Sequence, residues 1–184
     1  MKKNWLFIII VLISSTFIAQ TNYYTRTGNI GFEASVPSFE EVKTTNNTVS
    51  SILNVTTGKI AVLALVKGFR FKVALMEEHF NESYAESTQF PKATFSGEIL
   101  DFSMDNLSKE SVTYTLKGKL TFHGKTININ PKAIISIDNN KIYLTSTFIL
   151  NPEEFNIHIP KIVRKKVAKT VEVTINFVLI PKNK

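Results

Sequence analysis

An alternation of apolar and polar residues with a period of two constrains the fold of this chain most strongly. In Val112–Phe122, aliphatic and aromatic residues share one parity, while threonines and lysines occupy the other. The same alternation recurs across residues 127–137, 142–148 and 171–179. A strand places every second residue on one face, whereas a helix would scatter these residues around its axis. These stretches therefore predict antiparallel strands with one apolar face and one solvated face.

Four earlier segments also have the composition of strands: Tyr23–Ala34, Thr48–Val55, Lys59–Val66 and Ala93–Phe102. Lys59–Val66 is apolar at both parities, which predicts that both of its faces are buried. The chain should therefore contain about eight strands.

Residues 71–84 follow a helical spacing instead. Their apolar face is predicted to cover one end of the strand assembly, with a hydrogen-bonded core histidine in it: Leu75, Met76, His79 and Phe80. The acidic residues in this segment and just after it are expected to be solubilising: Glu77, Glu78, Glu82 and Glu86. A second short helical turn is predicted over Lys161–Lys169.

Eight long strands with apolar faces need cover that two short helices cannot supply. The sheet must therefore close on itself, which also removes exposed edges. We expect a mainly β protein, an antiparallel barrel of about eight strands with one short amphipathic helix over an end. Barrels of this size are filled by side chains or hold one slender ligand. A predicted apolar interior would line any ligand site: Phe32, Ile60, Val62, Phe95, Ile99, Tyr114, Leu116, Leu120, Ile129, Leu144, Phe148, Val173, Ile175 and Phe177.

The net charge of +7 is concentrated at the two ends of the chain. Residues 21–160 carry thirteen basic and fourteen acidic side chains, whereas residues 161–184 carry seven basic residues and one acid. A nucleic-acid-binding protein usually spreads basic residues over one face, so no nucleic-acid partner is expected. The basic stretch directly precedes a strand and would lie at a barrel rim, where an anionic head group could pair with Lys161, Arg164, Lys165 and Lys166.

Residues 1–20 have the organisation of a secretory signal peptide. Two lysines precede an apolar run over residues 5–13, and small and polar residues follow. A spanning helix needs about 20 apolar residues, so a cleaved signal is favoured over a membrane anchor. Residues 21–184 should then form one exported domain, periplasmic or extracellular.

Catalytic and metal-binding patterns are absent from the sequence. It has no cysteine, and it contains no nucleophile, metalloprotease, phosphate-loop or dinucleotide motif. The three histidines, His79, His123 and His158, lack the spacing of metal ligands. His123 precedes Gly124 and is expected to hold a tight turn. We expect neither an enzyme nor a cofactor.

Several runs resemble the YceI-like family of secreted, lipocalin-like barrels: Thr57–Ile60, Lys67–Phe71, Met76–Tyr84, Glu86–Phe95 and Leu116–Thr126. The family's early His-Met segment is replaced by Ala34–Pro37, and Glu77–Glu78 stand where the family often has Arg-Asp. The resemblance spans the mature chain and implies this fold. Well-known members of the family hold a polyisoprenoid inside the barrel.

The leading hypothesis is therefore a non-catalytic protein that holds an isoprenoid or another lipid. One alternative is a solid-cored stress or interaction barrel without a ligand. Another is an outer-membrane β-barrel, whose apolar face would point outward. Stable membrane insertion is not expected, and a homodimer is left open.

Overall fold

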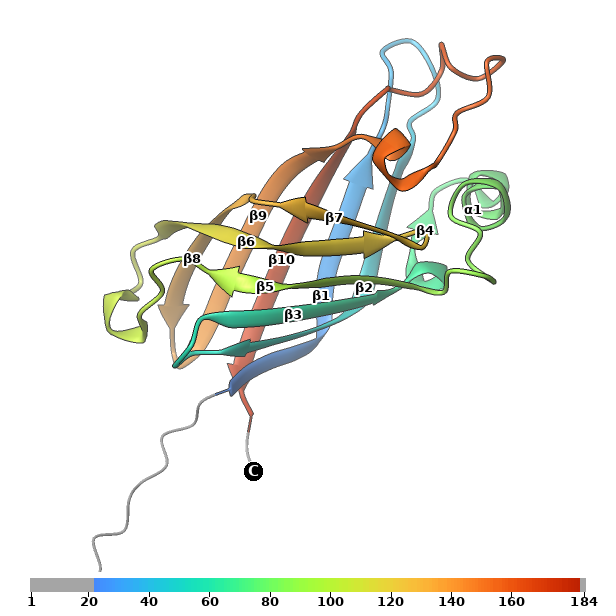
Figure 1. Cartoon of the computed structure of the whole chain (residues 1–184). Coiled ribbons are helices and arrows are strands. Elements are labelled where there is room, and N and C mark those ends of the chain that lie inside the picture. Colours follow the sequence, from blue (N-terminus) through green and yellow to red (C-terminus); the bar gives the residue numbers. More distant parts are fainter. Residues whose placement is uncertain (1–21, 183–184) are drawn as a thin grey trace, which may run out of the picture.

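The computed structural model describes residues 22–182, so the predicted signal peptide lies outside the described residues. Eight antiparallel strands form a closed ring in the order β1–β10–β9–β8–β6–β5–β3–β2, and β2 pairs with β1 to close it (Figure 1). The ring consists of β1 (Asn22–Glu33), β2 (Lys43–Asn54), β3 (Lys59–Leu65), β5 (Lys92–Ile99), β6 (Val112–Phe122), β8 (Lys132–Asp138), β9 (Lys141–Leu150) and β10 (Val171–Pro181). The predicted fold class, an antiparallel barrel of about eight strands with one short helix, is confirmed.

Two short strands extend the ring. β4 (Arg70–Phe71) pairs with β2, and β7 (Lys125–Ile129) pairs with β6. The alternation across residues 127–137 is therefore divided between β7 and β8 at Asn130–Pro131. Proline has no backbone N–H to donate, and the chain changes direction there. β6 pairs with β8 along its first half and with β7 along its second.

The expectation that both faces of Lys59–Val66 are buried is wrong. In β3, Ile60, Val62 and Ala64 are buried, whereas Leu63 and Leu65 are exposed on the outer wall. Within residues 22–182 nothing packs over β3 on that side, so its outer apolar residues stay in solvent. The apolar parity of the long strands points inward, which is opposite to the arrangement expected of an outer-membrane barrel.

The helical segment is shorter than its spacing predicted. α1 covers Ala74–His79, and a single π-helical turn continues it over Phe80–Tyr84. Three 3₁₀ turns complete the helical elements of the described residues, at Val66–Gly68, Met104–Asn106 and Pro152–Phe155. The helical turn predicted over Lys161–Lys169 is wrong: these residues form turns, with i to i−3 hydrogen bonds from Val163 N to Pro160 O and from Lys166 N to Val163 O.

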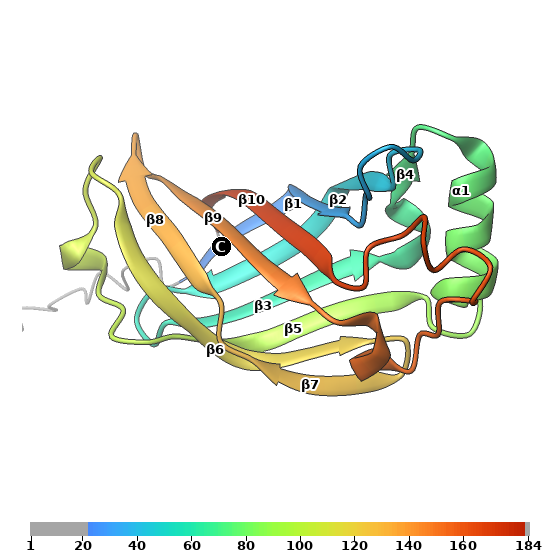
Figure 2. The same ribbon diagram turned by 90° about the horizontal axis from the view of Figure 1, so that it is seen from above.

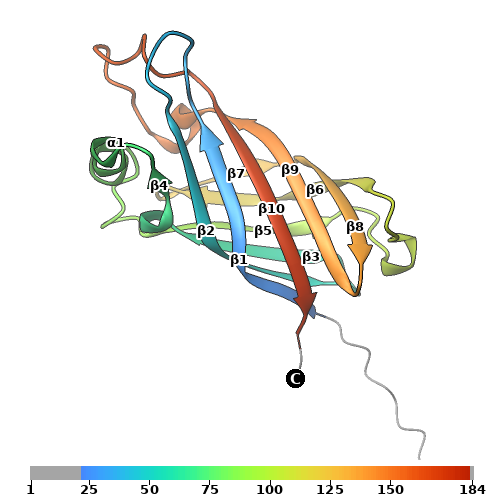
Figure 3. The same cartoon turned by 180° about the vertical axis from the view of Figure 1, so that it is seen from behind.

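The two ends of the barrel are built differently. At one end, which we call the mouth, α1 lies beside the β1–β2 connection (residues 34–42) and the segment of residues 156–170 (Figures 2 and 3). The opposite end, the packed end, contains the β8–β9 hairpin and residues 100–111. Its interior is filled by fully buried side chains: Val49, Leu53, Ile135, Ile142 and Leu179.

Candidate functional site

An apolar cavity of about 500 Å³ occupies the mouth half of the barrel. Twelve of the fourteen residues predicted to line the interior line this cavity: Phe32, Ile60, Val62, Phe95, Leu116, Leu120, Ile129, Leu144, Phe148, Val173, Ile175 and Phe177. The other two, Ile99 and Tyr114, are buried in the packed half instead. The interior is therefore hollow at one end and solid at the other.

A cluster of phenylalanine rings forms one wall of the cavity. The ring of Phe32 on β1 lies 5.5 Å from that of Phe69, 5.9 Å from Phe71 and 5.4 Å from Phe80. Phe122 and Phe155 make a similar contact at 5.8 Å. Tilted and edge-on aromatic pairs at such distances are favourable beyond their buried area. Rigid rings thus support a wall that has no packing partner on its cavity side.

Two facing glycines leave room for the ring of Phe95, which forms another part of the cavity wall. Gly97 on β5 and Gly118 on β6 face each other across the ladder. A Cβ added to Gly97 would lie 2.8 Å from Phe95 Cζ, and one added to Gly118 would lie 2.7 Å from the same atom. The Phe95 ring therefore lies against the glycine pair, where side chains at these positions would otherwise project inward.

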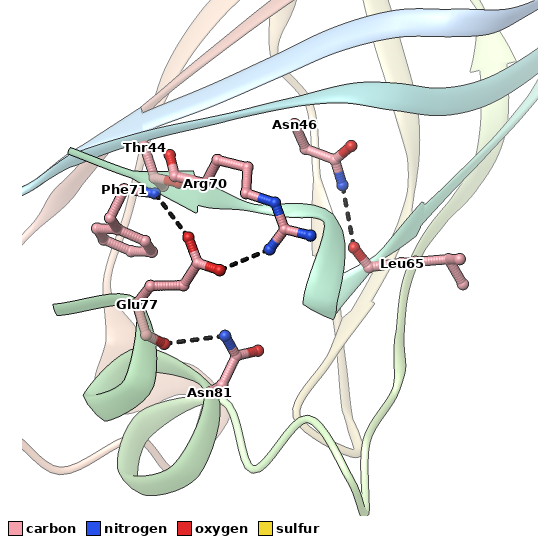
Figure 4. A network of polar contacts seen from close by, with 7 residues as sticks. All are labelled: Thr44, Asn46, Leu65, Arg70, Phe71, Glu77 and Asn81. Atoms are coloured by element: carbon pink, nitrogen blue, oxygen red, sulfur yellow. Dashed lines mark hydrogen bonds and ion pairs between the residues drawn. The ribbon is translucent and has the colours of Figure 1, made fainter. Parts of the chain in front are cut away.

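α1 is anchored to the rim by the carboxylate of Glu77 (Figure 4). Glu77 accepts hydrogen bonds from Arg70 Nη1 at 2.5 Å and from the Phe71 backbone N at 3.1 Å. Thr44 Oγ1 in turn donates to Arg70 O at 2.8 Å, which ties β4 to β2. The expectation that Glu77 is merely solubilising is therefore wrong, because it connects the helix to the sheet.

The helix residues predicted to cover a barrel end divide into two groups. Met76, His79 and Phe80 line the cavity, whereas Leu75 is 57% exposed and points away from the core. Tyr84, which the helical pattern did not single out, also lines the cavity. His79 is exposed, so the expectation of a hydrogen-bonded core histidine is wrong. His79 thus lies at the solvent-exposed edge of the cavity and not in the core.

His123 holds together three segments near the mouth. Its Nδ1 lies 2.8 Å from Phe155 O, its Nε2 lies 2.5 Å from Glu86 Oε2, and its ring packs edge-on against Phe90. Glu86, expected only to solubilise the helix, is thus part of this contact. His158 is exposed. Among residues 22–182, no group of His, Cys, Asp or Glu is placed to hold a metal ion.

The segment of residues 156–170 forms part of the cavity wall. Val163, Val167 and Ala168 line the cavity, and Ala168 N donates to Ala34 O at 2.8 Å. Of the four basic residues predicted at the rim, Lys166 lines the cavity, whereas Lys161, Arg164 and Lys165 are exposed without lining it. Sequence reasoning did not predict that this segment lines the cavity, because the apolar spacing of residues 161–169 was interpreted as a short helical turn.

The polar side chains that line the cavity are few, and they lie toward the mouth: Glu40, His79, Tyr84, Thr94 and Lys166. An ion pair lies at the same rim, where Lys43 Nζ is 3.2 Å from Glu33 Oε2. Its hydrogen bond lowers the pKa of the Glu33 carboxyl and raises the pKa of Lys43. The cavity is therefore apolar in its depth and carries charge only where it meets solvent.

Several solved structures are similar to this chain, and three of them are described here. A polyisoprenoid binding domain from Saccharophagus degradans, implicated in plant cell wall breakdown, matches with a TM-score of 0.75 and 11% identity over 89% of this chain and 99% of that chain. Burkholderia cenocepacia BcnA matches with a TM-score of 0.67 and 14% identity, over 82% of this chain and 95% of that chain. A Campylobacter jejuni YceI protein matches with a TM-score of 0.58 and 13% identity, over 81% of this chain and 90% of that chain.

A search of curated proteins by sequence finds no match. None of the helices in residues 22–182 has the length and hydropathy needed to cross a membrane. The model of the YceI-like domain matches residues 23–179, which include every strand of the ring in whole or nearly so. This chain therefore belongs to the YceI-like family.

Proposed function

We propose that this protein is a non-catalytic carrier that holds one apolar chain, an isoprenoid or another lipid, in the mouth half of its barrel. The observation that carries the proposal is the cavity of about 500 Å³ with an apolar lining. Apolar cavities of about 150 Å³ already stay dry and bind benzene. A larger apolar cavity in a stable barrel is therefore a favourable site for a hydrocarbon chain, and this argues against the solid-cored alternative.

Burial of hydrocarbon supplies the binding energy. Each Å² of apolar surface removed from water contributes about 25 cal/mol, so a tail that buries a few hundred Å² gains several kcal/mol. The similar domain from Saccharophagus degradans is described as polyisoprenoid-binding, which supports the same class of ligand here. The composition of residues 1–20 predicts a secretory signal, so we propose that the protein is exported and binds its ligand outside the cytoplasm.

The position of the polar lining residues favours one orientation of the ligand. The tail would enter the depth of the barrel, and the head would stay at the mouth beside Lys166, His79 and Glu40. Exposed charges contribute about 0–1 kcal/mol each, so the tail dominates the affinity. We expect a preference for an anionic head group that is small compared with the effect of tail length.

Titration of the mature chain, residues 21–184, with prenols of increasing length tests the proposal. Affinity should rise with each isoprene unit until the cavity is full, at one molecule per chain. Prenyl phosphates of matched length measure the head group, and Lys166→Gln should reduce their advantage while Lys165→Gln leaves it unchanged. Absence of saturable binding at every length would overturn the carrier function. Tail-length dependence without a head-group preference would retain the carrier and remove the role of Lys166.

A further inference from the structure

Three large apolar side chains project into solvent around the mouth. Ile162 is 87% exposed, Leu75 on α1 is 57% exposed, and Phe39, which also lines the cavity, is 47% exposed. They belong to three segments that are distant in sequence and meet at the same end of the barrel (Figures 1 and 3). Isolated exposed apolar residues are common, but three of them surrounding the opening of an apolar cavity form an unusual rim.

The same rim carries positive charge that the cavity does not use. Lys161, Arg164, Lys165 and Lys169 are exposed and do not line the cavity. No salt bridge involves any of the four in the described part of the chain. Residues 156–170 contain no acid. Glu40 and Glu41 of the neighbouring connection and Glu77, Glu78 and Glu82 of the α1 segment also lie at the mouth, so the excess of positive charge is confined to the segment of residues 156–170.

The two rim connections are held together as one surface. Ala168 N donates to Ala34 O at 2.8 Å, which joins the segment of residues 156–170 to the β1–β2 connection. Val163 and Val167 face the cavity from the same segment. One side of this segment therefore contributes to the cavity wall, while the other side presents cations and Ile162 to solvent.

We propose that this rim docks reversibly on the surface of an anionic lipid bilayer, with the mouth of the barrel turned toward the membrane. We define the docking rim as Phe39, Leu75 and Ile162 together with Lys161, Arg164, Lys165 and Lys169. Each cation near an anionic membrane strengthens binding about fivefold, and exposed apolar side chains enter the interfacial region of the lipid. Membrane docking is a property separate from the proposed carrier function, because a barrel without a bound ligand would dock as well.

Sedimentation of the mature chain with lipid vesicles tests this surface. Residues 21–184 are used because the apolar run of residues 5–13 would bind vesicles by itself, and the closed ring lies wholly within them. The protein should sediment with phosphatidylcholine vesicles that contain phosphatidylglycerol, and much less with pure phosphatidylcholine. Added salt should release it, since exposed charges are screened. Equal sedimentation with both vesicles, or with neither, would overturn the proposal.

Matched variants separate the docking rim from net charge. Combined replacement of Lys161, Arg164, Lys165 and Lys169 by Gln should weaken vesicle binding at least tenfold. The control replaces four exposed lysines away from the mouth: Lys59, Lys117, Lys141 and Lys182. It changes net charge equally and should weaken binding much less. Equal weakening by both variants would show attraction by net charge alone and overturn the docking rim.

A second pair of variants tests the apolar part of the rim. Ile162→Ser should weaken vesicle binding several-fold, whereas Ile134→Ser, at a half-exposed position on the outer wall, should not. Prenol binding is measured on the same proteins and should be unchanged. Intact prenol binding without vesicle binding overturns only docking. Intact vesicle binding without prenol binding overturns only the carrier function.

Discussion

The packed end and the mouth of this barrel are made from the same strands with the same alternation, yet only one of them is filled. On β10, Leu179 is fully buried in the packed end, while Ile175, also on the inner face, is half-buried and faces the cavity. The alternation thus decides which side chains point inward. The alternation does not decide whether the inward side chains pack against one another or leave a cavity between them.

The difference arises from what covers each end. At the packed end, the connection from β5 to β6 folds back as a 3₁₀ turn and brings Leu107, Phe102 and Met104 against the core. At the mouth, α1 contains no buried residue. Only Phe80 in the following turn is buried, among the phenylalanine rings. The mouth half stays hollow because α1 inserts no buried side chain into it, while contacts between phenylalanine rings support the cavity wall.

The largest expected effect compares two positions on β10. Leu179→Ala should lower the free energy of unfolding by about 2–5 kcal/mol, because it opens a void in a filled core. Ile175→Ala should cost about half as much, since the side chain already borders a cavity and leaves fewer contacts behind. Urea unfolding of both variants measures the difference. Equal losses would show that the two ends are packed alike.

An intermediate effect is expected at the glycine pair. Gly118→Ala places a Cβ 2.7 Å from Phe95 Cζ and 2.6 Å from Ser96 O, so ring and backbone must both move. Overpacking of this kind costs about 1–3 kcal/mol. Lys119→Ala, the exposed neighbour, should stay within about 0.5 kcal/mol. Thermal unfolding that does not distinguish Gly118→Ala from Lys119→Ala would contradict the close fit of Phe95 against the glycines.

A smaller effect on stability is expected at the helix anchor. Glu77→Gln should lower the free energy of unfolding by less than about 1 kcal/mol, because the Arg70 side chain is 68% exposed. Amide hydrogen exchange in residues 74–84 should nevertheless become faster, since Gln keeps one acceptor oxygen but loses the ion pair with Arg70 that helps to connect α1 to β4. Glu78→Gln, on the exposed side of the helix, serves as the control. Unchanged exchange in Glu77→Gln would remove the anchor from this description of the mouth.

The smallest effect concerns the packed end at high pH. Burial raises the pKa of Tyr23, whose hydroxyl donates to Asn140 Oδ1 at 2.6 Å. A phenol with a raised pKa stabilises the fold fully below its ordinary pKa of about 10 and loses that contribution as pH rises through the folded value. Tyr23→Phe should therefore flatten the decline in melting temperature above about pH 10. A decline as steep as that of the wild type would show that Tyr23 does not contribute.

Much of the barrel could be predicted from the sequence because strand periodicity survives folding. Val112–Phe122 forms β6 with the predicted bounds, and twelve predicted interior residues share the cavity. Ile99 and Tyr114 have the same parity, but which half of a barrel is filled depends on the connections that cover it. An alternation with a period of two does not reveal which connection covers which end of the barrel.

The mouth was predicted less well, for physical reasons that differ between its parts. Residues 161–169 have apolar spacing compatible with a helix, yet Val163 and Val167 face the cavity from a series of turns. His79 has the spacing of a core residue, but α1 lies at the rim and leaves it exposed. Phe69 and Phe155 line the cavity from 3₁₀ turns or their flanks, where no period marks them.

Methyl NMR of residues 21–184 during titration with a prenol tests the central claim most directly. The methyl groups of Leu120, Val173 and Ile175 at the cavity should shift and saturate at one molecule per chain. The methyl groups of Leu53, Ile142 and Leu179 at the packed end should stay nearly unchanged. Saturable shifts confined to the mouth would agree with one hollow and one solid end. The absence of saturable shifts, or equal shifts at both ends, would contradict it.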